Sequence, residues 1–451
     1  MSRDPSVVGR RRFLAISGTG ALATLAGCSG LLPGGSEPTV DADALAEAVS
    51  GDAPAVPETV PVDIEASFVD EQESIARSAL DGVPAPFDRE EIPNGVIRER
   101  LNGVYESATE SIDRVDEALT PYDRLDRANG ARVDAHEVQA AWRAIDADLT
   151  VSELTAETPA IAGSVDEVDA RWSYVGDDPV RAVVVHDEIG TEIRAARNWL
   201  DSRHRRTTRD GRTALEVGAL ASDHERARTS VAVASYLFDR FRASLDATAD
   251  LRARFEAARG ILRARVREAK TALPPQDVDE PTSLVDRDVD ETAGIRALAE
   301  LGSEARYRAK DVTASDRDGG DEVPWLANDV LGALDALVFV RAFASLRERI
   351  EDGDDIAVEG IEDVAAIRES AIDAVAEARD ADRGALLVDA MLPDLADEIR
   401  WTDDRLRRAS GTVSVDSVAY DAVDYVVAGA TCRALPPVCA ETAAALRNGS
   451  S

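Results

Sequence analysis

The stretch ARTSVAVASYLFDRFRASL, residues 227–245, decides the fold class. Its apolar residues recur every three or four positions, the spacing that lines one face of an α-helix. They are Ala227, Val231, Ala234, Phe238, Phe241 and Leu245. The pattern continues from Leu251 to Leu273 without a proline and with a single glycine, Gly260. It therefore predicts one helix over 212–273, about 60 residues and near ~90 Å long at 1.5 Å per residue. A tight hairpin near 246–250 is the alternative.

Most of the remaining chain follows the same helical spacing. Further helices are predicted at 66–80, 97–119, 124–148, 165–176, 179–203, 290–311, 323–350, 359–379, 384–408 and 414–434. No convincing series of strands accompanies them. We therefore expect an all-α protein, an elongated multi-helix bundle with long amphipathic helices. The run 334–346 is apolar on nearly every face, so we expect it at the centre of the C-terminal bundle.

Proline and aspartate mark the best internal boundary. They are concentrated between Pro274 and Asp290, a composition that breaks helices. We expect an acidic linker at 276–290 between an N-terminal helical region, 58–275, and a C-terminal helical bundle, 291–451. A length of 451 residues suits roughly two or three domains.

Composition points to a concentrated-salt environment. The chain has 87 acidic against 51 basic residues, a formal net charge of -36, and all of the basic residues except Lys270 and Lys310 are arginine. Carboxylates stay hydrated in salt, whereas the apolar lysine stem tends to be salted out. This composition resembles the proteins of extreme halophiles. With 44% hydrophobic and 31% charged residues, the chain falls outside the collagen-like, low-complexity and polytopic membrane classes.

The N-terminus carries the most specific motif. Arg10, Arg11, Phe13 and Leu14 precede a weakly apolar run, which ends in Leu-Ala-Gly before Cys28. The run has about half of the ~20 residues that a membrane-spanning helix needs. The first part resembles a twin-arginine export motif and the second a lipobox, as in the twin-arginine-exported lipoproteins of haloarchaea.

This resemblance implies a place for the protein in the cell. Residues 1–27 would be a signal peptide, and the Cys28 thiol would receive a lipid and become the new N-terminus. The Gly-, Pro- and Ser-rich start of 28–57 suits a flexible tether. The resemblance therefore implies lipid anchoring on the outer face of the cytoplasmic membrane.

Two further cysteines, Cys432 and Cys439, flank Pro436 and Pro437. A turn at the two prolines would bring the cysteine Cα atoms within disulfide range, and an exported protein is free to form the bond. Two buried free thiols are the alternative. Near the end of the chain, Asn448 begins a glycosylation sequon.

The sequence offers little for metal binding or catalysis. Its four histidines are His136, His186, His204 and His224, and none belongs to a recognised ligand pattern with the acidic residues near it. The mature chain also lacks the nucleophile and phosphate-loop motifs of common enzyme classes. We therefore expect no catalytic residue, no metal and no cofactor.

One segment reverses the acidic charge. Residues 203–270 carry 16 basic and 9 acidic residues, and the segment opens with a basic patch. The patch consists of Arg203, Arg205, Arg206, Arg209 and Arg212. Docking onto anionic headgroups or an acidic partner is one interpretation. We favour the other, packing against acidic residues of the same protein, because molar salt weakens steering by exposed charge. Nucleic acid is not expected as a partner of such an acidic chain.

These observations favour a non-catalytic role. We expect a lipid-anchored helical scaffold or binding protein, with the membrane and an envelope protein as its partners. The alternative is a helical solute- or metal-binding receptor lipoprotein. That receptor would have a cleft lined by polar groups, with His186 or His204 facing into it.

Overall fold

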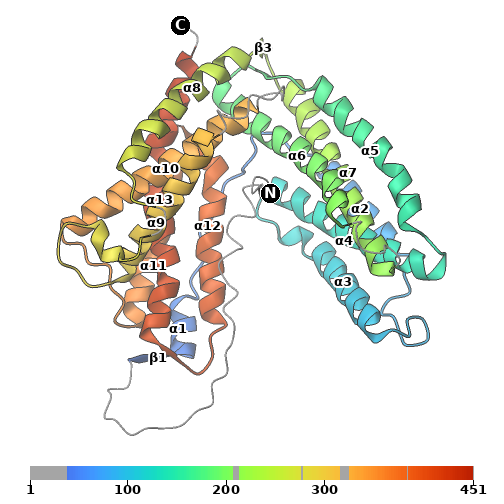
Figure 1. Cartoon of the computed structure of the whole chain (residues 1–451), viewed down its shortest axis with the longest axis horizontal. Coiled ribbons are helices and arrows are strands. Elements are labelled where there is room, and N and C mark those ends of the chain that lie inside the picture. The colour runs from blue at the N-terminus through green and yellow to red at the C-terminus, as the bar shows by residue number, and fades with distance from the viewer. Residues whose placement is uncertain (1–37, 207–212, 276–277, 315–324, 383, 450–451) are drawn as a thin grey trace. The chain divides into compact units, whose positions relative to one another are not determined.

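The computed structural model describes residues 38–206, 213–275, 278–314, 325–382 and 384–449. Over these residues the chain forms thirteen α-helices and four short strands, so the prediction of an all-α multi-helix protein is confirmed (Figure 1). The described chain divides into two compact units. We call residues 58–252 the inserted unit, because residues on both sides of it, 38–57 and 253–449, together form the second, split unit.

The inserted unit is a bundle of six helices centred on α4 and α7. α7 packs against α4, α5 and α6, and α4 also packs against α2 and α3. A two-stranded antiparallel ladder pairs Val175 with Asp250 and Gly176 with Ala249. The elements are α2 (Ala66–Leu80), α3 (Gly95–Asp113), α4 (Pro121–Asp146), α5 (Val151–Arg171), β2 (Val175–Gly176), α6 (Pro179–Arg206), α7 (Ala214–Ala243) and β3 (Ala249–Asp250).

The start of α7 follows from its sequence. The Thr213 hydroxyl accepts a hydrogen bond from the Glu216 backbone N–H, and the Glu216 carboxylate accepts one from the Thr213 N–H. This capping box satisfies two backbone donors that the first turn leaves without helical partners.

The prediction of one helix over 212–273 is wrong. α7 ends at Ala243, and a new helix, α8 (Arg252–Ala269), begins nine residues later in the chain. Between them β3 pairs with β2, and the Asp250 carboxylate accepts a hydrogen bond from the Arg252 backbone N–H. The two units divide at this break, at 252/253, and not at the predicted linker. Within that linker, Leu284 and Val285 are buried.

The split unit is built around its last helix, α13 (Val415–Asn448). α13 packs against four other helices, α9, α10, α11 and α12. The apolar run 334–346 lies in α10, where Leu334, Val338 and Leu346 are buried. The remaining elements are α8, α9 (Ala293–Ala314), α10 (Leu326–Glu351), α11 (Ile361–Arg379), α12 (Ala385–Arg407) and β4 (Thr412–Ser414).

The residues before the inserted unit complete the split unit. β1 (Thr39–Asp41) pairs antiparallel with β4, and α1 (Ala42–Ala48) packs against α11 and α12. Leu45 and Val49 are fully buried. The expectation of a flexible tether is therefore wrong for residues 38–57, because this segment contributes to a hydrophobic core. None of the described helices is both long enough and apolar enough to cross a bilayer.

Candidate functional site

His186 is enclosed in the core of the inserted unit. Its Nδ1 accepts a hydrogen bond from the Trp172 indole N–H at 3.0 Å, and its Nε2 lies 2.8 Å from the Val175 carbonyl. The Val175 backbone N–H also lies 3.1 Å from Nε2, so both ring nitrogens have hydrogen-bond partners inside the core. Burial lowers the pKa of His186 to about 4, despite the opposing hydrogen bond to Val175, so the ring is neutral at pH 7. Tyr174 and Phe241 contact its ring edge to face. His186 therefore does not face a cleft, contrary to the receptor hypothesis.

A network of buried charges lies across α2, α4 and α7. Glu225 of α7 is only 2% exposed, and its carboxylate accepts hydrogen bonds from Arg132 Nε at 2.5 Å and Arg228 Nη1 at 3.2 Å. Arg132 also donates to Gln72 Oε1 at 2.6 Å. Burial alone would raise the pKa of Glu225, but the charges of His136 and Arg132 lower it on balance. The network thus holds an ionised, satisfied carboxylate.

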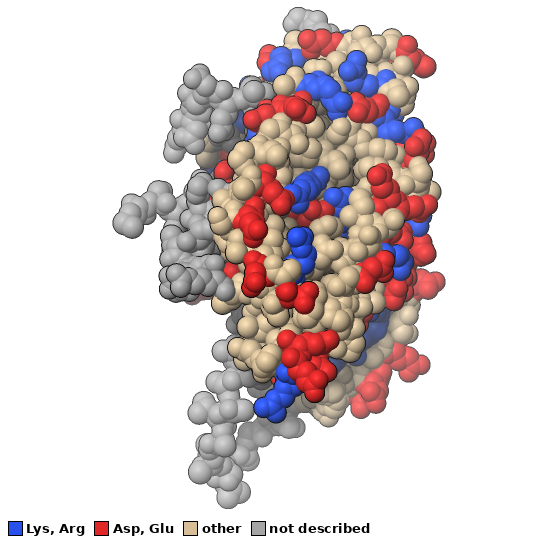
Figure 2. All heavy atoms as spheres, turned by 90° about the vertical axis from the view of Figure 1, so that its right-hand side faces the viewer, with Lys and Arg blue, Asp and Glu red and all other residues tan. Residues whose placement is uncertain are grey.

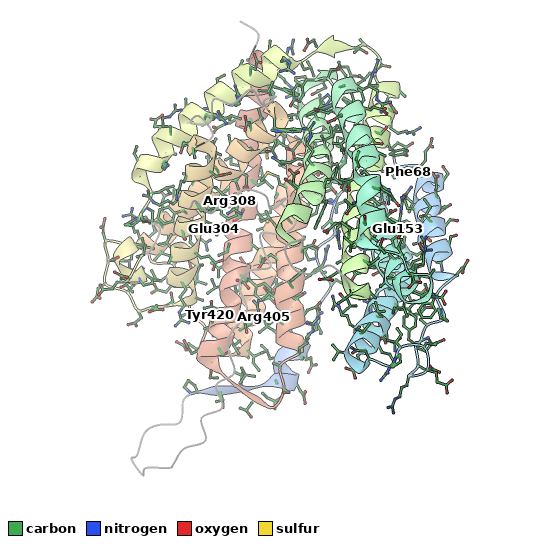
Figure 3. The ribbon with its side chains drawn as sticks, turned by 45° about the vertical axis from the view of Figure 1, so that its right-hand side comes forward. Phe68, Glu153, Glu304, Arg308, Arg405 and Tyr420 are labelled. Atoms are coloured by element: carbon green, nitrogen blue, oxygen red, sulfur yellow. The ribbon has the colours of Figure 1, made fainter. Side chains whose placement is uncertain are left out.

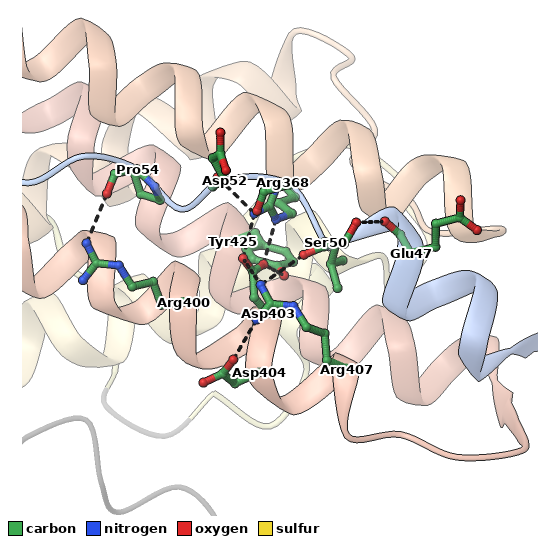
Figure 4. A network of polar contacts seen from close by, with 12 residues as sticks. Glu47, Ser50, Asp52, Pro54, Arg368, Arg400, Asp403, Asp404, Arg407 and Tyr425 are labelled. Atoms are coloured by element: carbon green, nitrogen blue, oxygen red, sulfur yellow. Dashed lines mark hydrogen bonds and ion pairs between the residues drawn. The ribbon is translucent and has the colours of Figure 1, made fainter. Parts of the chain in front are cut away.

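A second buried network joins three helices of the split unit (Figure 4). Arg368 of α11 donates from Nε and Nη2 to the two oxygens of Asp403 on α12, at 2.7 Å each. The Tyr425 hydroxyl of α13 donates to Asp403 Oδ1 at 2.5 Å, and Arg407 lies 3.3 Å from Oδ2. Because Asp403 is fully buried, these donors replace all of the water that an ionised carboxylate would otherwise bind.

The same arginines bind the chain that leads to the inserted unit. We call residues 49–54 the strap. Arg368 Nη2 donates to the carbonyls of Gly51 and Asp52 at 2.9 and 3.3 Å. Arg407 donates to the Val49 carbonyl at 3.3 Å, and Arg400 donates to that of Pro54 at 3.1 Å. Guanidinium groups of α11 and α12 thus donate to four backbone carbonyls of the strap, and Figure 4 labels two of these residues, Asp52 and Pro54.

Several carboxylates of α12 and α13 lie around one arginine, and we call this set the Arg405 cluster. Arg405 pairs with Asp421 at 2.7 Å and with Asp424. Glu398 lies near Asp424, and Glu300 of α9, which is exposed, adds another carboxylate. Burial, followed by the charge of Asp424, raises the pKa of Glu398 to about 7, while Arg405 acts in the opposite direction. Glu398 is therefore the carboxylate of the Arg405 cluster that we expect to change protonation near neutral pH.

Cys432 and Cys439 are free thiols, so the predicted disulfide is wrong. Pro436 and Pro437 lie inside α13 and not in a turn. Seven residues of α-helix separate two positions by about 10 Å, beyond the ~7 Å limit for a disulfide. Both side chains are buried, and burial raises the pKa of Cys432 to about 12.

An open surface pocket of about 570 Å³ lies in the split unit. Asp279, Glu280 and Arg347 contribute charge to its lining, and Phe343 contributes an aromatic ring. None of the four histidines lines it. Among the described residues, no group of three or more histidine, cysteine, aspartate or glutamate side chains is placed to hold a metal ion.

The other predicted site residues fall into two sets. Arg203, Arg205 and Arg206 end α6, as does His204. Arg209 and Arg212 lie outside the described residues, and so do all residues of the export motif and lipobox, namely Arg10, Arg11, Phe13, Leu14 and Cys28.

In the rest of the basic segment, arginines of α8 pair with acidic residues of the same unit, as the favoured interpretation of internal packing predicts. Arg259 and Arg263 of α8 pair with Asp329 of α10 at 3.2 and 3.3 Å. Arg265 pairs with Glu441 of α13 at 3.0 Å. These arginines hold α8 against its acidic neighbours in the split unit.

Neither buried network, around Glu225 or around Asp403, was predicted from the sequence. The Glu225 network had a readable signal, because Asp223, His224 and Glu225 interrupt the apolar pattern of α7. All three are buried. The Asp403 network had no such signal, since its members come from three helices and the strap.

These features define the class of protein: a two-unit, all-α protein whose buried polar networks join its helices. Residues 67–247 match the family model for a domain of unknown function, DUF8262. Residues 252–444 match a second, DUF8264. The two matches meet where the structure divides, so each corresponds to one unit. No curated protein and no solved structure matches the chain.

Proposed function

We propose that the chain is a lipid-anchored, extracytoplasmic scaffold or binding protein of a halophilic archaeon. The observation that carries this proposal is the order of motifs at the N-terminus. A twin-arginine pattern at Arg10 and Arg11 precedes a short apolar run, and Cys28 follows it at the lipobox position. Export and lipidation each require one of these motifs.

The split unit supports a short distance between anchor and folded body. Cys28 precedes Pro38 by ten residues. From Thr39 onward the chain is held by β1–β4 pairing, by α1 and then by the strap. A lipid on Cys28 would therefore hold the split unit near the membrane, the arrangement expected of a scaffold that engages an envelope partner.

Surface charge supports the proposed saline environment. Figure 2 shows one face of the molecule, on which acidic side chains are spread over the surface with basic ones among them. A carboxylate-rich surface retains water in concentrated salt, where the Debye length falls to about 3 Å at 1 M.

Substitution of Cys28 tests the anchor. In a haloarchaeal host, the wild type should fractionate with membranes, and mass spectrometry should find a lipid on an N-terminal Cys28. Cys28→Ser should abolish the modification and release the protein from the membrane fraction. Ser29→Ala, which preserves the thiol, is the matched control. An intact, unmodified leader on wild-type protein in the cytosol would refute the proposal.

A further inference from the structure

Two aromatic side chains are exposed on neighbouring helices of the split unit. Trp401 of α12 is 63% exposed and Tyr420 of α13 is 69% exposed. Among the described residues, these are the only aromatics in the set of exposed large hydrophobic side chains. Both rings are amphipathic, with an apolar body and a polar N–H or O–H.

Contacts between α12 and α13 place the helix turns that carry the two aromatics side by side. Thr402, which follows Trp401, bonds to Asp424 at 3.3 Å, and Arg405, one turn later, pairs with Asp421 at 2.7 Å. Tyr420 directly precedes Asp421, and Figure 3 shows Tyr420 beside Arg405. Trp401 and Tyr420 thus belong to the turns that carry the Arg405 cluster, and we call the pair the aromatic edge.

The aromatic edge also lies close to the start of the folded chain. The Val415 backbone N–H, at the start of α13, donates to the Pro38 carbonyl at 2.9 Å. Tyr420 is five residues further along α13, an axial distance of about 8 Å. The ten residues from Cys28 to Pro38 span at most ~35 Å when fully extended. An anchor on Cys28 therefore keeps this end of the split unit close to the bilayer.

We propose that the aromatic edge, Trp401 and Tyr420, contacts the surface of the bilayer that holds the anchor. This inference rests on the proposed lipidation of Cys28. Tryptophan and tyrosine favour the headgroup region, where the ring is apolar on one side and hydrated on the other. The contact orients the split unit, so that the anchor and the edge hold it at two points.

The acidic residues near the aromatic edge determine how lipid charge and salt concentration affect this contact. Asp421 and Asp424 outnumber Arg405 in the Arg405 cluster, and Glu398 adds a further carboxylate. Anionic headgroups would be repelled in dilute salt but screened in molar salt. The contact is therefore apolar, and it strengthens as salt rises, the opposite of docking by a basic patch.

The test uses the mature chain, residues 28–451, coupled through Cys28 to a maleimide lipid in phosphatidylcholine vesicles at molar salt. Cys432 and Cys439 are buried, so Cys28 is the thiol available for coupling. Brominated acyl chains near the headgroups quench tryptophan fluorescence. We expect quenching in the wild type and loss of most of it in Trp401→Phe. Trp325→Phe, at the start of α10, is the control and should leave it intact.

Two results would overturn the inference: no quenching in the wild type, or equal quenching in wild type and Trp401→Phe. A Trp401 signal that depends on protein density and not on brominated lipid would assign the edge to a second copy, and would also overturn it. Circular dichroism checks that each variant is folded. Tyr420→Ser should independently weaken the quenching of Trp401. Because maleimide supplies the anchor, failure here is distinct from failure of Cys28 lipidation in cells.

Discussion

Asp403 shows what one buried charge requires of its surroundings. Its two oxygens accept four hydrogen bonds, two from Arg368 and one each from Arg407 and Tyr425, and the side chain is fully buried. A buried pair adds little net stability compared with well-packed apolar residues, but removal of one partner leaves an uncompensated charge. The network therefore makes the arrangement of α11, α12 and α13 specific, and it ties the strap to them.

Arg368→Met should be strongly destabilising for this reason. It leaves the Asp403 carboxylate without its bidentate partner and two strap carbonyls without a donor. We expect a loss of about 3–5 kcal/mol in the free energy of unfolding, measured by denaturant titration in molar salt. Arg408→Met, at an exposed pair with Asp404, is the control, with a change of at most ~0.5 kcal/mol. Equal effects of the two substitutions would contradict the structure.

Glu398 should give the split unit a pH dependence. Because its pKa is raised to about 7 from 4.5, the folded state binds the proton more tightly than the unfolded state. Its contribution to stability is therefore present below about pH 4.5 and is lost as pH rises to about 7. Glu398→Gln should be more stable than wild type at pH 8 by about 1 kcal/mol, after allowance for solvent screening, and closer to it at pH 5. Glu398→Asp should retain the pH dependence. An equal difference at both pH values would argue against the raised pKa.

At the scale of elements, helix type and several helix ends could be predicted from the sequence, as at 66–80, which are the bounds of α2. The spacing from Ala227 to Phe241 is local and predicts α7 correctly. The break after it lies at the place of the alternative near 246–250. The pairing of β3 with β2, more than seventy residues earlier in the chain, is a contact that no local pattern reports. Pro436 and Pro437 gave the opposite error, because a turn was predicted where the helix continues. A proline normally disfavours helix, yet both are accommodated within α13. The Asp403 network could not be predicted from local patterns either, because it depends on contacts between residues of different elements.

Leu45 tests whether α1 is part of a core or part of a tether. Its side chain is fully buried in the split unit, so Leu45→Ala should remove about 2–5 kcal/mol from the free energy of unfolding. Leu119→Ala is the control, because Leu119 is 59% exposed and its truncation should cost little. Thermal or denaturant unfolding in molar salt measures both. A flexible tether over 38–57 would leave Leu45→Ala as stable as wild type.

At the scale of the whole molecule, the chain enters the inserted unit at 57/58 and leaves it at 252/253. Each unit has its own buried residues, and each corresponds to a separate family match. Residues 58–252 expressed alone in molar salt should therefore be helical and unfold cooperatively, as seen by circular dichroism. Residues 253–451 alone should be less stable than the same residues with 38–57 restored through a short linker. Equal stability of residues 253–451 with and without 38–57 would contradict the assignment of both segments to one unit.

Salt should act on the whole molecule through its net charge of -36. Like charges repel in the compact state, and the Debye length grows from about 3 Å at 1 M to about 10 Å at 0.1 M. Repulsion between carboxylates is therefore screened at 1 M salt and acts over a longer distance at 0.1 M. We expect the helical circular dichroism signal to fall on dilution and to return when salt is restored. Sodium chloride and potassium chloride should act alike, because screening depends on ionic strength and not on a bound ion. Full helicity at 0.1 M, or recovery with only one of the two salts, would show that screening is not what stabilises this chain.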